Sequence, residues 1–294
     1  MTDAADLADL TGIYRDLHAH PELAFAEHRT AEIVAARLRD LGYQTTTGVG
    51  GTGVVGLLAN GDGPTVLLRA DMDGLPVLER TGLDYASADH GQSADGKQVP
   101  VMHACGHDAH VTCLLGAAAE LAADASSWSG TLLLVSVRTF DQGVRAKVLT
   151  AIERIATAEA AASGAKQPPE IISLGAFPVV VNDAAACAKV TDAFAAALGP
   201  GLVLDPGPVT GSEDVGLLAT ASGAPCAYWL LGCADPALFA GIASLDEARS
   251  IVETLPSNHS PLFAPVIEQT LRTGVAALTS AARAWLAAAD RTTG

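Results

Sequence analysis

Three histidines, a cysteine and an aspartate gather in the stretch VMHACGHDAHVTCLLGAA, residues 101–118, directly before an apolar run. The members of this cluster are His103, Cys105, His107, Asp108 and His110. Thiolate and imidazole are good ligands for zinc and similar divalent ions, and Cys105 and His107 are separated by one residue in a glycine-containing loop. Since a metal-bound imidazole needs an orienting partner, Asp108 and His110 are candidates for that supporting role. The cluster therefore predicts a metal centre at the entrance of a helix.

Two aspartates end an apolar, strand-like run in the stretch RADMDGLP, residues 69–76. Asp71 and Asp73 stand two positions apart, so their side chains point the same way along an extended chain. In open α/β sheets, ligands bind at the carboxyl ends of the strands. The same residues also suit an N-cap or a turn before Pro76. The sequence alone supports a ligand-binding role and a turn-forming role equally.

Two further loops carry side chains that can do chemistry. His259 stands in SNHSPLF before the last predicted helix, where it is either an exposed loop histidine or a distant ligand that closes the metal site. Glu213 and Asp214 stand in GSED, which also reads as the start of a helix capped by Ser212. Both alternatives stay open for each of these loops.

The GVGGTG stretch, residues 48–53, fits the glycine pattern of dinucleotide-binding loops. That pattern needs a strand before it and a helix after it. Here it precedes the apolar run VVGLLA, so the order is reversed. We therefore expect a glycine-rich turn into a strand rather than a nucleotide site.

Composition narrows the class of protein. The chain has 294 residues, a formal net charge of -16, 49% hydrophobic residues and 17% charged residues. Such a chain can bury a core, while its acidity argues against a nucleic-acid partner, which needs a basic face. The N-terminus lacks the pattern of a signal peptide, and no apolar stretch reaches the roughly 18 residues of a membrane span. We therefore expect a cytoplasmic protein with no membrane partner and with reduced cysteines.

Helical and strand-like patterns alternate along the chain. Helix patterns cover EHRTAEIVAARLRDLGY, a segment that begins near His110, and a last helix from Phe263 to Leu286. Continuous apolar runs predict strands at TGVVGLLA, TVLLRADMD, GTLLLVSVRTF and, at residues 224–232, APCAYWLLG. This alternation predicts an α/β fold with a sheet sandwiched by helices.

The middle of the chain looks like a small β-α-β piece of its own. After Asp141, a predicted N-cap, one amphipathic helix is bracketed by the strand-like runs SVRTF and EIISLGAFPVVV. A piece of about 45 residues is close to the lower limit for unaided folding. We therefore expect it to depend on other parts of the chain.

Six stretches, taken in order, resemble the M20 family of metal-dependent amidohydrolases and peptidases, in the branch of the hippurate hydrolases and indole-acetyl-amino-acid hydrolases. They are RDLHAHPELAFAEHRTA, RADMDGLP, MHACGHDAH, VRTFD, GSED and NHSPLF. The resemblance implies a metal-dependent exopeptidase-like sheet between helices, and a site for two metal ions. Cys105, His107 and His259 match metal ligands of that family. Asp73 matches an acidic residue that supports the site, and Asp71 stands beside it as a further supporting residue.

The resemblance also implies a reaction. It is the hydrolysis of an N-acyl amino acid to a carboxylic acid and an amino acid, with zinc, manganese, cobalt or nickel as the divalent metal. In the family, a glutamate acts as the general base.

The sequence departs from the family after the strand GTLLLV. There the family carries a Phe-Gln-Pro-Ala-Glu-Glu motif, which supplies the general base and a metal ligand, whereas this chain continues with SVRTFDQGV. A further histidine ligand and most of a small lid domain are also missing, which indicates an internal deletion. The resemblance thus divides the chain into residues 1–135 and 179–294, two parts of a catalytic-type α/β domain, and residues 136–178, a truncated α+β remnant of the lid and dimerisation domain.

The deletion limits the function that the resemblance implies. Cys105, His107 and His259 suffice for one metal site, whereas a second site lacks its ligands. Loss of a general base costs about a hundred- to ten-thousand-fold in rate, and Glu213 is the speculative substitute. We expect a weak or inactive amidohydrolase that binds a small N-acyl amino acid, with a homodimer weakened by the partial lid. The alternative is a non-catalytic metal- or ligand-binding remnant of such a hydrolase.

Overall fold

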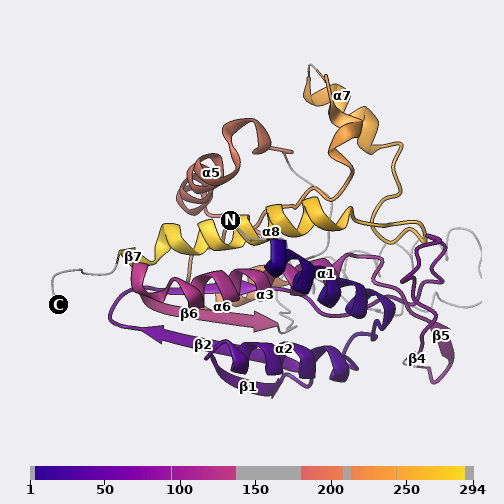
Figure 1. Ribbon diagram of the computed structural model, residues 1–294, viewed down its shortest axis with the longest axis horizontal. Coiled ribbons are helices and arrows are strands. Elements are labelled where there is room, and N and C mark those ends of the chain that lie inside the picture. The colour runs from indigo at the N-terminus through magenta and orange to yellow at the C-terminus, as the bar shows by residue number, and fades with distance from the viewer. Residues whose placement is uncertain (1–3, 94, 137–179, 208–212, 243, 289–294) are drawn as a thin grey trace, which may run out of the picture. The chain divides into compact units, whose positions relative to one another are not determined.

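The computed structural model describes residues 4–93, 95–136, 180–207, 213–242 and 244–288 (Figure 1). The chain forms two compact units. The first unit is made of Met1–Val137, Ala188–Asp205 and Trp229–Gly294, and the second of Arg138–Cys187 and Pro206–Tyr228. The sheet described next and the predicted metal-binding cluster both belong to the first unit.

A mixed sheet with the strand order β1-β2-β6-β3 lies in the first unit. These strands are β1 (Gln44–Val49), β2 (Gly53–Asn60), β6 (Trp128–Ser136) and β3 (Thr65–Arg69). The pairs β1–β2 and β2–β6 are antiparallel, whereas β3 runs parallel to β6. The short strand β7 (Ala287–Ala288) pairs with β6, and β4 (His90–Gln92) pairs with β5 (Gln98–Pro100) in a separate hairpin. Leu132 and Leu134 of β6 are buried, so this strand runs through the core.

Long helices pack on one another in the same unit (Figure 1). They are α1 (Ala4–Ala19), α2 (His28–Asp40), α3 (His107–Ala123) and α8 (Ile267–Trp285). Helix α3 contacts each of the other three, and α2 also contacts β1 and β2. The other helices are α5 (Ala184–Leu198), α6 (Val215–Ser222) and α7 (Leu245–Val252), with 3-10 turns at Ala125–Ser127, Pro200–Leu202 and Pro236–Phe239. Helix α3 is thus the common neighbour of the helical layer.

Glycine allows α3 and α8 to approach closely. A Cβ atom on Gly274 would lie 2.3 Å from Cys113 Sγ, and one on Gly116 would lie 2.4 Å from Val275 Cγ2. Distances this short exclude any larger residue without a shift of the helices. Helix α3 is therefore a tightly packed base for the residues at its N-terminus.

Most of the predicted elements are confirmed. The first predicted helix is α2, and the runs TGVVGLLA, TVLLR and GTLLLVS form β2, β3 and β6. The helix expected near His110 is α3 and begins at His107. The last predicted helix is α8, which begins at Ile267 because Val266 is still extended, with φ -74° and ψ 109°. The mixed α/β arrangement follows from these elements.

The expected glycine turn is also confirmed. GVGGTG connects β1 to β2, which pair as an antiparallel hairpin. Gly48, Gly50 and Gly51 have positive φ angles of 75°, 67° and 121°. Such angles are open to glycine and costly for other residues, which explains the glycines without any nucleotide.

The strand predicted at residues 224–232 is wrong, because the described structure has no strand there. The Asn182 side chain donates to Tyr228 O at 2.9 Å and accepts from Tyr228 N at 2.7 Å. Asp183 N donates to Cys226 O at 2.8 Å. These bonds use backbone groups that a neighbouring strand would need, so the apolar run forms no ladder.

Some elements of the structure were not predicted, and some predictions fall outside the described residues. Helix α1 and strand β1 were not predicted. The predicted lid remnant at residues 136–178 and the helix after Asp141 fall, apart from the end of β6, outside the described residues, so this division stays a prediction. Among the described helices, none combines the length and the apolar composition needed to cross a membrane.

Candidate metal centre

The two aspartates of RADMDGLP lie where β3 ends. Asp71 and Asp73 are both buried, at 7% and 2% exposure. Directly after them, Gly74 N donates to Glu22 O at 2.6 Å. Leu75 and Met102 form an antiparallel bridge, with N···O distances of 2.8 and 3.0 Å. The segment that follows β3 is therefore fixed to the segment that leads into the histidine cluster.

A glycine turn starts α3 at the cluster. Gly106 has φ 80°, in the left-handed region, and stands at the N-cap of α3. Its N–H donates to His103 O at 3.1 Å, and its carbonyl accepts from His110 N at 3.1 Å. A Cβ atom on Gly106 would also lie 3.4 Å from a ring carbon of Phe263. The turn makes His107 the first residue of the helix and directs it toward the end of β3.

The imidazole of His107 is held by both aspartates. Its Nδ1 lies 2.9 Å from the Asp73 carbonyl oxygen and 3.0 Å from Asp73 Oδ1. Its Nε2 lies 3.8 Å from Asp71 Oδ2. Since a backbone carbonyl only accepts, Nδ1 carries a proton and donates it. In the neutral ring the lone pair is then on Nε2, the atom that faces Asp71.

These three residues form a compact donor set. One ligand atom from each of Asp71, Asp73 and His107 lies within 4.8 Å of the others. Carboxylate oxygens and a neutral imidazole suit zinc and other divalent ions, and the Asp73–His107 contact is the partnership that orients metal-bound histidines. The Arg69 guanidinium donates to Asp71 Oδ1 at 2.6 Å and offsets part of the negative charge. The residues present therefore fit a divalent metal ion.

The groups around His107 also stabilise positive charge at its ring. Burial by itself lowers the pKa of His107, but hydrogen bonds with Asp73 and Cys105 outweigh it and raise the pKa well above its usual value. The opposite holds for His110, whose ring lies 5.2 Å from that of His107. Burial and the nearby His107 lower the pKa of His110 to about 4, so this ring is neutral near pH 7.

The loop that contains His259 docks on the loop of Cys105. His259 N donates to Ala104 O at 2.7 Å, and Asn258 Nδ2 donates to Cys105 O at 3.4 Å. His259 has φ 71°, which is uncommon for a non-glycine residue. Its side chain is exposed, and neither Cys105 nor His259 belongs to the compact donor set. The structure thus brings the predicted distant residue beside the predicted loop, and its role as a ligand stays a prediction.

Asp108 lies in the same helical turn but faces away from the donor set. Its Oδ2 lies 2.7 Å from His18 Nδ1, and its Oδ1 accepts from Ala109 N at 2.8 Å. Neither bond orients a ring of the cluster directly. His103 is 1% exposed, and burial lowers its pKa. The orienting roles that we predicted for Asp108 and His110 stay predictions, whereas the groups seen on the His107 ring are Asp73, Asp71 and Cys105.

His18 is the residue of this region that the sequence patterns did not single out. It sits near the end of α1, whose Leu7, Leu10, Tyr14 and Leu17 are buried. Their spacing of three or four residues is the signal that marks an amphipathic helix. Reading that pattern would have placed α1, although not the partners of His18.

Glu213, the speculative substitute base, belongs to the second unit. Its carboxylate accepts from Asp214 N at 2.8 Å and from Val215 N at 3.0 Å. These donors are backbone groups at the start of α6, so GSED does lead into a helix, but the N-cap is Asp214 and not the predicted Ser212. The catalytic role of Glu213 stays a prediction.

Known proteins resemble the same part of the chain. The sequence model of Peptidase family M20/M25/M40 matches residues 67–138, which run from β3 through α3 to β6. The IAA-amino acid hydrolase ILR1-like 5 of Arabidopsis thaliana is 39% identical over 138 residues, which cover 47% of this chain and 30% of that protein. The hippurate hydrolase of Campylobacter jejuni is 43% identical over 134 residues, which cover 44% of this chain and 32% of that protein.

The similarity of the fold extends further than the similarity of the sequence. The crystal structure of the Bacillus subtilis YXEP protein, described as a dinuclear metal binding peptidase from the M20 family, has a TM-score of 0.70. It is 20% identical and covers 96% of this chain and 99% of that chain. This likeness confirms the predicted fold class. The sequence matches span about a third of the length of the curated relatives, 30% and 32% in the two proteins above.

Proposed function

We propose that this chain, which is similar to the M20 metallopeptidases, holds a divalent metal ion at the end of β3 and that this centre supports hydrolysis of an N-acyl amino acid. The arrangement of the His107 ring carries this proposal. Asp73 fixes Nδ1 from two oxygens, and Nε2 faces Asp71 Oδ2 at 3.8 Å. A ring fixed in this way is prepared to bind a metal through Nε2.

Each residue then has a definite part. His107 Nε2 and Cys105 Sγ would hold the ion from the cluster, and His259 would hold it from the docked loop. Asp73 holds the ring, and Asp71 adds negative charge beside it. A bound divalent ion polarises an amide carbonyl and makes water a stronger nucleophile near neutral pH. Three protein ligands leave a position for that chemistry, as in other catalytic zinc sites.

The proposed reaction lacks one component in this chain. From Ser136, the last residue of β6, the sequence continues SVRTFDQGV, where the family carries a glutamate pair that supplies the general base. A missing base lowers the rate by about a hundred- to ten-thousand-fold. We therefore expect slow turnover, with Glu213 as the first residue to test as a substitute.

The missing glutamate pair also supports a second candidate function. In that case the chain binds a metal ion, or a small N-acyl amino acid, without hydrolysing it. Measurements of metal content and of turnover distinguish the two, because only the first function releases an amino acid.

The test uses the purified chain with zinc, manganese, cobalt or nickel and a panel of N-acetyl and N-benzoyl amino acids. Metal per chain is measured by elemental analysis, and released amino acid by chromatography. Cys105→Ala should lose most of the bound metal. Cys187→Ala, which removes a half-buried thiol of the second unit, should keep it.

Each outcome decides something. Amino acid released by the unmutated chain and by Cys187→Ala, but not by Cys105→Ala, supports the hydrolase. Bound metal without turnover supports the second candidate. Metal content that is unchanged in Cys105→Ala would rule out Cys105 as a ligand, and a chain that binds no metal would exclude the hydrolase and the metal-binding form of the second candidate.

A further inference from the structure

His18 is enclosed between two carboxylates in the core of the first unit. Its side chain is 0% exposed. Nδ1 lies 2.7 Å from Asp108 Oδ2, and Nε2 lies 3.1 Å from Glu79 Oε1. The rings of Tyr14 and Tyr85 pack on the imidazole, with centroids 5.6 and 5.2 Å away. The side chains of His18, Glu79 and Asp108 are 0%, 1% and 0% exposed, so their hydrogen bonds must be made within the protein.

The contacts determine the charge of this ring. An ionised carboxylate only accepts hydrogen bonds, so a histidine between two of them must donate from both nitrogens. Burial alone raises the pKa of Glu79, yet the hydrogen bonds from His18, Thr81 and Ser87 lower it overall. Each ring nitrogen of His18 lies within hydrogen-bond distance of a carboxylate oxygen, so with both carboxyl groups ionised the ring is an imidazolium.

Asp108 connects His18 to the candidate metal centre. Asp108 follows His107 in the chain and lies in the first turn of α3. Its Oδ1 accepts from Ala109 N, and its carbonyl accepts from Thr112 Oγ1 at 2.7 Å. If the Asp108 carboxylate loses His18, it must turn toward another donor, and the turn that carries His107 must move with it.

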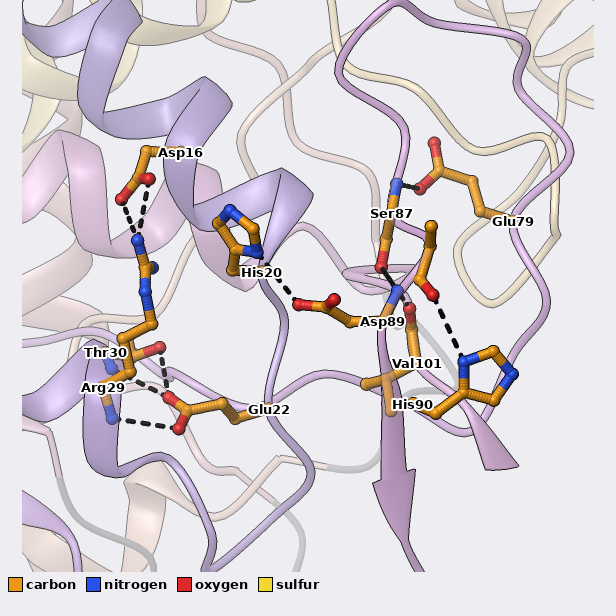
Figure 2. Close-up of polar contacts among 11 residues, drawn as sticks. Asp16, His20, Glu22, Arg29, Thr30, Glu79, Ser87, Asp89, His90 and Val101 are labelled. Carbon is orange, nitrogen blue, oxygen red and sulfur yellow. Dashed lines mark hydrogen bonds and ion pairs between the residues drawn. The ribbon is translucent and has the colours of Figure 1, made fainter. Parts of the chain in front are cut away.

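Glu79 connects His18 to the segment that follows β3. Glu79 Oε2 accepts from Ser87 N at 2.7 Å, and Ser87 Oγ donates to Val101 O at 2.8 Å (Figure 2). The next residue, Met102, is bridged to Leu75, two positions after Asp73. A chain of contacts therefore runs from His18 to the segment that holds Asp73.

We propose that His18 is a positioning residue for the metal centre, which clamps the start of α3 and the segment after β3 in the spacing that aligns His107 with Asp73. This role rests on the proposed metal binding of this chain. His18 itself touches neither the metal ligands nor the reacting atoms. It acts through Asp108 and Glu79.

The test compares His18→Gln with His20→Gln in the full chain. His20 follows His18 by two residues in the sequence. It pairs with Asp89 at 2.9 Å, but at an exposed position (Figure 2). Affinity for cobalt alone is measured by absorption titration and by calorimetry, and related to the folded fraction from circular dichroism. His18→Gln should bind cobalt about 10- to 100-fold more weakly, which is the usual loss when a residue that supports a metal site is substituted. His20→Gln should bind as the unmutated chain does.

The results separate this role from general stabilisation. An unchanged cobalt affinity per folded His18→Gln chain, with only a lower melting temperature, would overturn the proposal while metal binding stands. If the unmutated chain binds no cobalt, the proposed function fails, and the positioning role fails with it.

Two further measurements apply if His18→Gln does not fold. Nitrogen NMR of the unmutated chain at pH 8 should show both ring nitrogens of His18 protonated, and a neutral ring would overturn the proposal. Glu79→Gln keeps the imidazole and the shape of its partner. It should weaken cobalt binding several-fold, and an affinity equal to that of His20→Gln would contradict the clamp.

Discussion

Two histidines near the end of α1 each contact carboxylates, and these contacts share their chemistry but differ in their surroundings. His18 is 0% exposed, and its partners Glu79 and Asp108 have side chains that are 1% and 0% exposed. His20 is 49% exposed and its partner Asp89 is 48% exposed. From the residue types alone, the contacts of the two histidines would be expected to stabilise the protein equally. Their burial indicates that one belongs to the core and the other to the surface.

The difference has a direct physical cause. When a buried ion pair loses one partner, the charge that remains has neither a counter-ion nor water. At the surface, water takes the place of the lost partner, and salt screens the pair from the start. We infer that the His18 contacts hold the site together, whereas the His20 contact adds little.

The largest expected effect is that of His18→Leu. This change leaves the carboxylates of Glu79 and Asp108 in the core without their shared cation. Removing one member of a buried ionic network costs about 3–5 kcal/mol. Urea unfolding followed by circular dichroism should show a loss of this order in the free energy of unfolding. A loss below about 1 kcal/mol would mean that the two contacts are equivalent after all.

A titration should show an intermediate effect that depends on His18 alone. Burial lowers the pKa of His18, but hydrogen bonds with Asp108 and Glu79 raise it overall from 6.5 to about 9. Because the folded pKa exceeds the unfolded one, the contribution of His18 to stability is complete below pH 6.5 and is lost as the pH rises through about 9. The stability difference between the unmutated chain and His18→Leu should therefore shrink across this window.

Urea unfolding of both chains at several pH values between 6 and 10 measures that difference. Groups remote from His18 that titrate in this range are common to both chains and cancel. A difference that stays constant over the window would show that His18 does not carry the charge that the structure indicates.

The sequence signals around the candidate metal centre are local. Asp71 and Asp73 follow a strand-like run, and the histidine cluster precedes a helix pattern, so each stretch could be assigned from its immediate neighbours. That Asp73 contacts the ring of His107 was not predicted, because the two residues lie 34 positions apart.

Other features could not be predicted, because they depend on residues far apart in the chain. His18 is 90 positions from Asp108 and 61 positions from Glu79. The run at residues 224–232 has the apolar composition of a strand, yet Asn182, 46 positions from Tyr228, takes its backbone bonds. No local pattern contains such partners, and only the folded chain selects them.

The smallest expected effect completes the comparison. His20→Leu removes an exposed contact that water and salt already weaken, so its cost should lie between about 0 and 1 kcal/mol. Added sodium chloride should reduce even this difference, whereas the loss in His18→Leu should change little because the buried carboxylates are shielded from the salt solution. Urea unfolding of both variants at low and high salt measures the contrast. A large, salt-independent loss in His20→Leu would show that the Asp89 contact supports the fold, and burial would then no longer distinguish the two histidines.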